Sequence, residues 1–172
     1  HSCMKKKFKI IAAVEQQRGI GFKNRLPWRL QADMQWFKKT TTSSLSCRKN
    51  AVIMGRHTWE TIPVKRRPLA DRQNIIITST LKNVPGAATA VDLDKGLKLA
   101  AAVNGDIFII GGAMLYETAL KHPDFSELII TEINRKYNCD TFFPDYSFLH
   151  KETLLQEGSE NGVTFKMFSR YR

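Results

Sequence analysis

One carboxylate in the amino-terminal half of the chain stands apart from the other charged residues. Asp33 is the only acidic residue between positions 16 and 59. It lies beside Met34 and one helical turn from both Leu30 and Phe37, near the edge of an apolar stripe. A lone carboxylate beside an apolar helix face either caps nearby backbone groups or receives a cationic ligand. The residue pattern alone leaves both interpretations open.

Glycine occupies two turns at which an apolar strand gives way to a helix. Gly111 and Gly112 follow the run that ends at Ile110, and Gly55 follows the run that ends at Met54. Glycine at such a turn lets the backbone approach a ligand closely, and the free N–H groups of the next helix can bind a phosphate. Backbone geometry explains either turn equally well. The two together favour a diphosphate site, although their spacing is not that of the usual dinucleotide fingerprint.

Cationic and hydroxyl side chains follow two of the predicted strands. Arg56 and His57 come directly after Gly55, and Thr78 and Ser79 end the next apolar run. If the two strands are parallel, these groups lie at one edge of the sheet, where they suit an additional phosphate. Solvation of ordinary surface side chains is the alternative explanation.

The elements that position these residues alternate along the chain between apolar strands and helices. The apolar runs are rich in Ile, Val and Phe nearly throughout, which is typical of strands covered on both faces. We therefore predict an α/β fold, with a mostly parallel central β-sheet flanked by helices and antiparallel C-terminal edge strands near 164–171, after a turn region at 158–162. The predicted strands are Phe8–Val14, Ala51–Met54, Asn74–Thr78, Asp106–Ile110 and Glu127–Ile133, and the predicted helices are Leu30–Thr41, His57–Thr61, Leu93–Val103 with Asp92 as its N-cap, and Ala113–Leu120.

Length and composition favour one domain. The 172 residues are 42% hydrophobic, enough for a single core, and ten Gly with six Pro exclude collagen-like and low-complexity classes. No apolar run approaches the roughly 18 residues that a membrane helix needs. The basic and apolar opening segment is predicted to be the first strand and not a signal peptide. We expect one domain over residues 4–172, with His1, Ser2 and Cys3 appended ahead of a plausible initiator Met4.

The positive charge is concentrated in the first half of the chain. Residues 1–75 hold 17 Lys and Arg against four Asp and Glu, a net +13, whereas residues 76–172 hold ten against twelve, a net −2. Nucleic acid, a small polyanionic ligand or a merely solvated basic face each fits this distribution. No helix-turn-helix, aromatic RNA platform or zinc spacing supports nucleic acid. Cys3, Cys47 and Cys139 have no paired spacing for zinc or for a disulfide framework, which favours a reducing compartment, with cytoplasm or nucleus as the default and cytoplasm the prediction.

Seven short motifs, taken in order, resemble the dihydrofolate reductase family. They extend over nearly the whole chain, and their order and spacing favour a functional interpretation of Asp33. The motifs are Gly19-Ile20-Gly21, Leu26-Pro27-Trp28, Asp33-Met34 with Phe37, Ile53-Met54-Gly55-Arg56 with Thr58-Trp59 and Pro63, Arg67-Pro68-Leu69 with Arg72, Ile110-Gly111-Gly112 with Tyr116, and Asp140-Thr141-Phe142-Phe143-Pro144.

The resemblance implies reduction of 7,8-dihydrofolate to 5,6,7,8-tetrahydrofolate for one-carbon metabolism, with a hydride passing from NADPH to the pterin C6 and a proton to N5. Asp33 then is the active-site carboxylate that binds the pterin. Trp28 helps to hold the water through which the proton arrives, and Leu26 lies on a mobile loop, Glu15–Pro27, over the nicotinamide. The implied ligands are dihydrofolate, NADPH and antifolate inhibitors, bound to a monomer without a nucleic-acid or membrane partner.

The resemblance also implies two sets of binding residues. Arg72 matches the arginine that grips the α-carboxylate of the glutamate tail. The substrate set is Ile11, Asp33, Met34, Phe37, Ile62, Leu69, Arg72, Ile110 and Thr131, with Thr131 hydrogen-bonded on the Asp33 side. The cofactor set is Ala13, Ile20, Gly21, Ile110 and Tyr116 near the nicotinamide, Gly55, Thr58, Gly111, Gly112, Ala113, Met114 and Leu115 near the diphosphate, and Arg56, His57, Thr78 and Ser79 at the 2′-phosphate.

Two positions depart from the family pattern. Asp71 stands where the family usually has glycine, which changes the turn and the charge next to Arg72. His57 stands where some members have lysine, which implies a mild pH dependence of cofactor discrimination. A pyrimidine reductase that shares the fold and NADPH is the competing enzyme class, and Asp33 with Arg72 favours a pterin with a glutamate tail over it.

Overall fold

A single eight-stranded sheet organises the computed structural model, which describes residues 6–43 and 45–172. The segment predicted to be appended, residues 1–3, lies outside the described residues. The strand order is β5-β4-β3-β6-β1-β7-β10-β9, parallel from β5 to β7 and antiparallel at β10 and β9. This confirms the predicted fold class. The strands are β1 Phe8–Val14, β3 Asn50–Gly55, β4 Arg72–Ile77, β5 Ala87–Ala90, β6 Ile107–Ile109, β7 Phe125–Ile133, β9 Lys151–Glu160 and β10 Val163–Tyr171.

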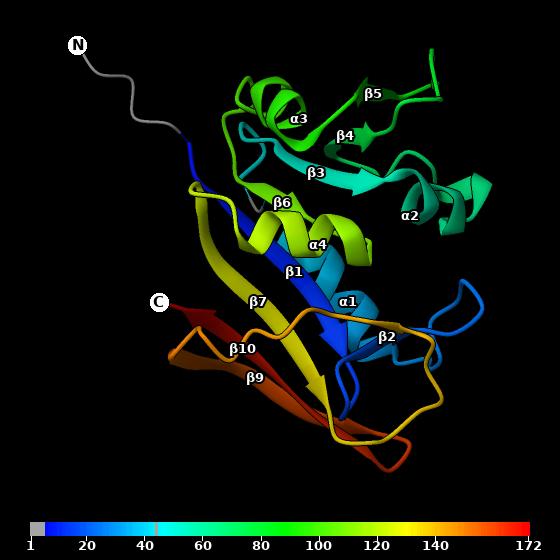
Figure 1. Cartoon of the computed structure of the whole chain (residues 1–172), viewed down its shortest axis with the longest axis vertical. Coiled ribbons are helices and arrows are strands. Elements are labelled where there is room, and N and C mark those ends of the chain that lie inside the picture. The colour runs from blue at the N-terminus through cyan, green and yellow to red at the C-terminus, as the bar shows by residue number, and fades with distance from the viewer. Residues whose placement is uncertain (1–5, 44) are drawn as a thin grey trace.

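Helices cover both faces of the central parallel strands, so β1, β3 and β6 are buried and apolar on both sides. In Figure 1, α4 crosses in front of β1 while α1 lies behind it. The α3 and α4 side buries one cluster that includes Ile10, Ile53 and Leu128, and the α1 and α2 side buries another that includes Ile11 and Val52. The helices are α1 Gln31–Thr41, α2 Arg56–Thr61, α3 Leu93–Ala100 and α4 Ala113–Leu120, with a short 3-10 turn, η1, at Val64–Arg66.

The predicted ends of the elements differ from the observed ends by a few residues. Leu30 is the N-cap residue of α1 and not its first helical residue. Asp92 caps α3 as predicted, since its carboxylate accepts a hydrogen bond from Lys95 N at 2.9 Å. That helix ends at Ala100 and not at Val103, where the chain turns. Within the described residues no helix has the length and apolarity needed to cross a membrane.

The C-terminal hairpin turns inside the predicted turn region, at its last two residues. The predicted turn region covered 158–162, but Gly158 lies inside β9, and the turn is the pair Asn161 and Gly162, with φ of 51° and 79°. Both angles are left-handed, as a two-residue hairpin turn requires. A Cβ at Gly158 would lie 3.0 Å from the Phe165 ring across the strands. That glycine therefore serves close strand packing and does not end the strand.

Part of the predicted mobile loop Glu15–Pro27 is a strand of a second, small sheet. It pairs β2, Gly19–Gly21, with β8, Thr141–Phe142, and the sequence pattern did not predict either strand. A Cβ at Gly19 would lie 2.3 Å from the Cys139 sulfur, so only glycine fits where the two segments meet. The loop that carries Leu26 is therefore joined to a segment more than a hundred residues away.

Candidate active site

Asp33 lies in the first turn of α1 and faces the sheet. Leu30 offers no side-chain cap to this helix, and the Glu160 carboxylate of β9 caps it instead, accepting hydrogen bonds from Gln31 N and Ala32 N at 2.9 Å each. The Asp33 Oδ1 atom accepts a hydrogen bond from the Thr131 hydroxyl of β7 at 2.8 Å. The Thr131 contact expected from the resemblance is present. It fixes the carboxylate between α1 and the centre of the sheet.

Burial makes Asp33 a weaker acid than an ordinary aspartate. It raises the pKa of Asp33 from 3.8 to about 6, and the Thr131 hydrogen bond lowers that pKa only in part. Near it, the buried Tyr116 of α4 donates its hydroxyl hydrogen to the Ile11 carbonyl at 2.8 Å. Burial first and the Asp33 charge second raise the pKa of Tyr116, so Tyr116 stays neutral. Asp33 is therefore a titratable group near physiological pH at the predicted pterin site.

The shifted pKa predicts that Asp33 lowers stability as pH rises. Between its unfolded value of 3.8 and its folded value of about 6, the folded chain binds more protons, so the free energy of unfolding falls across that window. The full shift corresponds to about 3 kcal/mol, and solvent screening reduces it to about 1–2 kcal/mol. Denaturant unfolding should therefore show that the free energy of unfolding of Asp33→Asn, relative to the native protein, is about 1–2 kcal/mol higher at pH 7 than at pH 4. A pH-independent difference would contradict a buried, weakly acidic Asp33.

The apolar residues of the predicted substrate set converge beside Asp33. Ile11 of β1 and Ile110 after β6 are buried in one cluster, and Phe37, Ile62 and Leu69 pack against its edge. Thr131 is buried next to them. Met34, placed on the same helix stripe as Phe37, is 46% exposed, and Leu26 is 59% exposed. Met34 is the most exposed apolar side chain of the predicted substrate set, and Leu26 belongs to the loop that is predicted to cover the nicotinamide.

Arg72, the first residue of β4, is held from two sides. Its Nε donates to the Ala70 carbonyl at 2.8 Å and its Nη1 to the Thr41 hydroxyl at 2.9 Å. The buried Asn74 side chain fixes the preceding segment, since it accepts from Leu69 N and donates to the Leu69 and Arg72 carbonyls. Sequence reasoning missed Thr41 and Asn74. Asn74 was visible as an amide beside three isoleucines, but the Thr41 contact had no local signal.

The two glycine turns meet at neighbouring strand ends. Gly55 N donates to the Gly111 carbonyl at 2.9 Å, and both α2 and α4 begin with a glycine N-cap that has no capping side chain. A Cβ at Gly111, where φ is +136°, would lie 3.0 Å from the Thr58 hydroxyl. The surface between the turns therefore exposes backbone N–H groups and the Thr58 hydroxyl, a donor set that fits a diphosphate. The glycines keep that surface open.

The phosphate-binding candidates gather at the next strand end. Because β3 and β4 are parallel with Gly55 paired to Ile77, Arg56 and Thr78 follow at the same edge, as expected. Arg56 Nη1 contacts both Glu60 carboxylate oxygens, at 3.0 and 3.2 Å, which sequence reasoning missed although the spacing of four residues suits such a pair. His57 and Ser79 are exposed beside them.

The remaining predicted residues come from several elements, and Trp28 packs with Leu30, Ile133 and Val163 in a third apolar cluster. Trp28 is buried, and its Nε1 donates to no acceptor among the described residues. In α4, the Met114 side chain is 87% exposed and the Leu115 side chain packs toward the core. Ala13 lies on β1, Ile20 and Gly21 on β2, and Ala113 opens α4.

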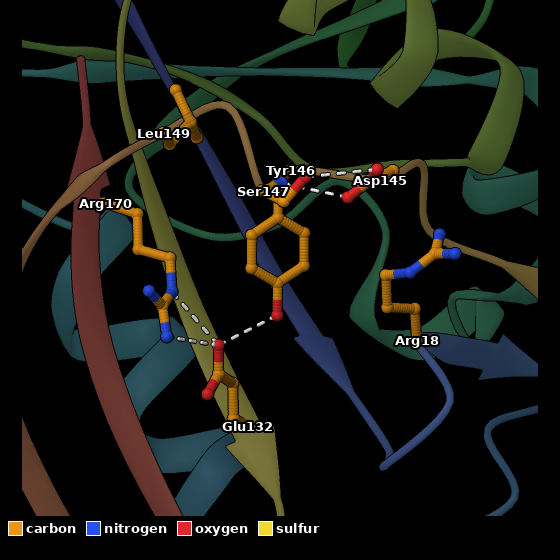
Figure 2. A pocket seen from close by; sticks show the side chains of 7 residues that line it. All are labelled: Arg18, Glu132, Asp145, Tyr146, Ser147, Leu149 and Arg170. Carbon is orange, nitrogen blue, oxygen red and sulfur yellow. Dashed lines mark hydrogen bonds and ion pairs between the residues drawn. The ribbon is translucent and has the colours of Figure 1, made fainter.

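Two cavities of about 310 and 880 Å³ are lined by none of the predicted site residues, and Glu132 and Tyr146 border both of them. Since alternate residues of a strand face opposite sides, Thr131 points to α1 and Glu132 points away from it. Figure 2 shows Tyr146 and Arg170 reaching the Glu132 carboxylate, at 2.8 Å from Tyr146 Oη and 3.0 Å from Arg170 Nε. Because Glu132 is already paired, this network has a structural role in joining β7 to β10.

The mostly parallel sheet, with a half-buried acid beside it and glycine turns at its strand ends, defines an α/β fold of the class in which enzymes commonly bind ligands at the carboxyl edge of the sheet. Comparison with known proteins gives the particular family. A family profile described as dihydrofolate reductase matches residues 7–170. The chain belongs to the dihydrofolate reductase family, which makes it an oxidoreductase of a family that reduces dihydrofolate to tetrahydrofolate with a nicotinamide cofactor.

Individual relatives agree with that assignment. The chain is 40% identical over 171 residues to dihydrofolate reductase of Schistosoma mansoni, covering 91% of each sequence. It is 36% identical over 172 residues to the Drosophila melanogaster enzyme, covering 93% of this chain and 94% of that one. A solved structure of the Schistosoma mansoni enzyme superimposes with a TM-score of 0.83 at 33% identity, covering 97% of this chain and 98% of that one.

Proposed function

We propose that this chain reduces 7,8-dihydrofolate to 5,6,7,8-tetrahydrofolate with NADPH and so supplies one-carbon metabolism. The observation that carries the proposal is the half-buried Asp33 carboxylate, bonded to Thr131 at the edge of an apolar cluster. A flat heterocycle with N–H donors along one edge suits that combination of one acceptor and apolar walls. Family membership supports the same reaction.

Asp33 binds and orients the pterin. Its pKa of about 6 leaves it mostly ionised at neutral pH, where it accepts hydrogen bonds from the pterin N–H edge while Thr131 holds its other side. Ile11, Phe37 and Ile110 exclude water from the ring. Trp28 Nε1, which has no protein acceptor among the described residues, donates to the water that carries the proton to N5.

The residues of the two glycine turns would hold the cofactor. Gly55, Gly111, Gly112 and Thr58 hold the diphosphate through the backbone N–H groups and the hydroxyl. NADPH supplies the hydride when bound. Ala13, Ile20 and Tyr116 pack at its nicotinamide end, and Leu26 on the loop 15–27 covers it. Arg56, His57, Thr78 and Ser79 bind the 2′-phosphate.

One absorbance assay tests the reaction. Purified protein mixed with dihydrofolate and NADPH should lose the absorbance of both, with tetrahydrofolate as product. NADPH oxidation with a pyrimidine precursor but not with dihydrofolate would instead identify the competing enzyme class. Salt-sensitive binding of DNA or RNA without NADPH oxidation would overturn the enzyme assignment altogether.

Replacing Arg56 by Ala should raise the KM for NADPH while leaving the KM for NADH unchanged. A hydrogen bond to a charged group contributes about 1.5–3 kcal/mol, so the increase is expected at about tenfold or more. The Glu60 pairing of Arg56 competes with the phosphate and lowers this effect. Glu60→Gln, which frees the guanidinium, should lower the KM for NADPH. An unchanged preference between the two cofactors in Arg56→Ala would place the 2′-phosphate elsewhere.

A further inference from the structure

Helix α1, which carries Asp33, has no cap from its own residues. Its N-cap residue is Leu30, whose side chain accepts no hydrogen bond, and its first two N–H groups belong to Gln31 and Ala32. The Glu160 carboxylate accepts one hydrogen bond from each of them, Oε2 from Gln31 N and Oε1 from Ala32 N, both at 2.9 Å. Both oxygens of one distant carboxylate are therefore bonded to the two residues that directly precede Asp33.

Glu160 reaches the helix from the tip of the C-terminal hairpin. It is the last residue of β9 and pairs with Val163, the first residue of β10. Asn161 and Gly162, both with left-handed φ, join the two strands, so a two-residue turn fixes where Glu160 lies. Val163 belongs to the same buried apolar cluster as Leu30. The hairpin tip therefore meets the start of α1 with both an apolar cluster and a charged cap.

The place of Asp33 depends on the first turn of α1. The first N–H groups of a helix have no intrahelical acceptor, and losing a cap shifts the equilibrium between a formed and an open turn about two- to thirtyfold. Asp33 lies in this turn, and its hydrogen bond to Thr131 of β7 requires the turn to stay formed. Burial there raises the pKa of Asp33 from 3.8 to about 6. Burial first and the Asp33 charge second keep Tyr116 of α4 neutral, so Tyr116 does not titrate with Asp33.

We infer that Glu160 is a positioning residue of the dihydrofolate site, which holds Asp33 in its buried place by capping α1. The inference rests on the proposed function, because Asp33 is the group proposed to bind the pterin. Glu160 acts through two backbone N–H groups and not on the substrate. Loss of the cap should therefore weaken the use of dihydrofolate and leave NADPH binding unchanged, since the glycine turns lie at the ends of β3 and β6.

Two substitutions at Glu160 test the inference. Glu160→Ala removes both acceptor oxygens, whereas Glu160→Gln loses the charge but keeps one acceptor, so it should retain part of what Glu160→Ala loses. In Glu160→Ala, kcat/KM for dihydrofolate should fall about two- to thirtyfold, the range of a lost cap, with a native KM for NADPH. The Gln31 and Ala32 amide hydrogens should exchange faster with solvent in both variants.

A titration of Asp33 separates positioning from a merely structural role. Carbon-13 NMR of the Asp33 carboxyl, without ligands, should give a pKa about 0.5–1 pH unit lower in Glu160→Ala than in the native protein, because the side chain is more hydrated. A residue that only stabilises the fold would lower the free energy of unfolding and leave this pKa native. Glu157→Gln and Glu157→Ala are the matched controls, exposed on the same strand, and should keep native kinetics and the native titration.

The results decide separately on Glu160 and on the reaction. A native Asp33 pKa or a native kcat/KM for dihydrofolate in Glu160→Ala would overturn the inference and leave the reaction standing. Equal losses with dihydrofolate and NADPH would also overturn it, because general loosening would then be the cause. Should Glu160→Ala not fold, the same measurements on Glu160→Gln decide. If the native protein does not oxidise NADPH with dihydrofolate, the proposed function itself fails and the inference fails with it.

Discussion

Replacing Asp33 by Asn should lower turnover at neutral pH by a factor of about 30 to several thousand. Losing one partner of a buried, charged hydrogen bond costs about 2–5 kcal/mol, and each 1.36 kcal/mol of barrier is a factor of about ten in rate. The amide keeps the carbonyl oxygen that accepts from Thr131, so the helix and strand stay joined. What it loses is the negative charge that binds the pterin edge.

The same variant separates catalysis from folding. Because the raised pKa of Asp33 makes its ionised form unfavourable in the folded chain, Asp33→Asn should be at least as stable as the native protein at pH 7 while much less active. Steady-state kinetics and denaturant unfolding on one preparation give both numbers. Glu157→Gln serves as the carboxylate-to-amide control and should keep native turnover. Native activity in Asp33→Asn would remove Asp33 from the mechanism.

The central fold could be predicted because its elements carry local signals. Strand β1 and helix α4 have the predicted bounds, since each is an apolar segment delimited by turn residues. The short strands β2, β5 and β8 carry no such signal. Their residues form strands because of their partners: Gly19 fits against Cys139, and β5 lies beside β4. Strand formation at these places is a tertiary effect, and hydrophobic periodicity does not encode it.

The candidate site also has some features that local sequence predicts and others that depend on residues far apart in the chain. Local sequence could predict that the two glycine turns lie close together, and that Arg56 lies near Thr78. Each of these residues follows a strand, and the ends of neighbouring parallel strands meet at one edge of the sheet. The contacts that hold helix α1 and Asp33 in place could not be predicted from local sequence. The Glu160 cap and the Thr131 hydrogen bond each join residues about a hundred or more positions apart. The family resemblance supplied Thr131. No signal in the sequence indicated Glu160, since a glutamate that caps a distant helix resembles any other glutamate in the sequence.

Replacing Arg72 by Leu should weaken dihydrofolate binding by about 10- to 150-fold, because hydrogen bonds to a charged group contribute about 1.5–3 kcal/mol. The NADPH affinity should be unchanged, since the glycine turns lie at the ends of other strands, β3 and β6. Leu fills the buried volume but leaves the Ala70 carbonyl and the Thr41 hydroxyl without Arg72, so some stability is lost as well.

Binding of both ligands by calorimetry, under conditions where unfolding curves show the variant folded, separates the loss of the tail contact from general destabilisation. Arg72→Lys provides the second comparison: it keeps the charge but cannot hold two partners while presenting a planar pair of donors to a carboxylate. It should recover only part of the lost affinity, and dihydropteroate should bind all three proteins alike. Equal weakening of dihydrofolate and NADPH would mean that the guanidinium supports the fold and that the tail carboxylate binds at another residue.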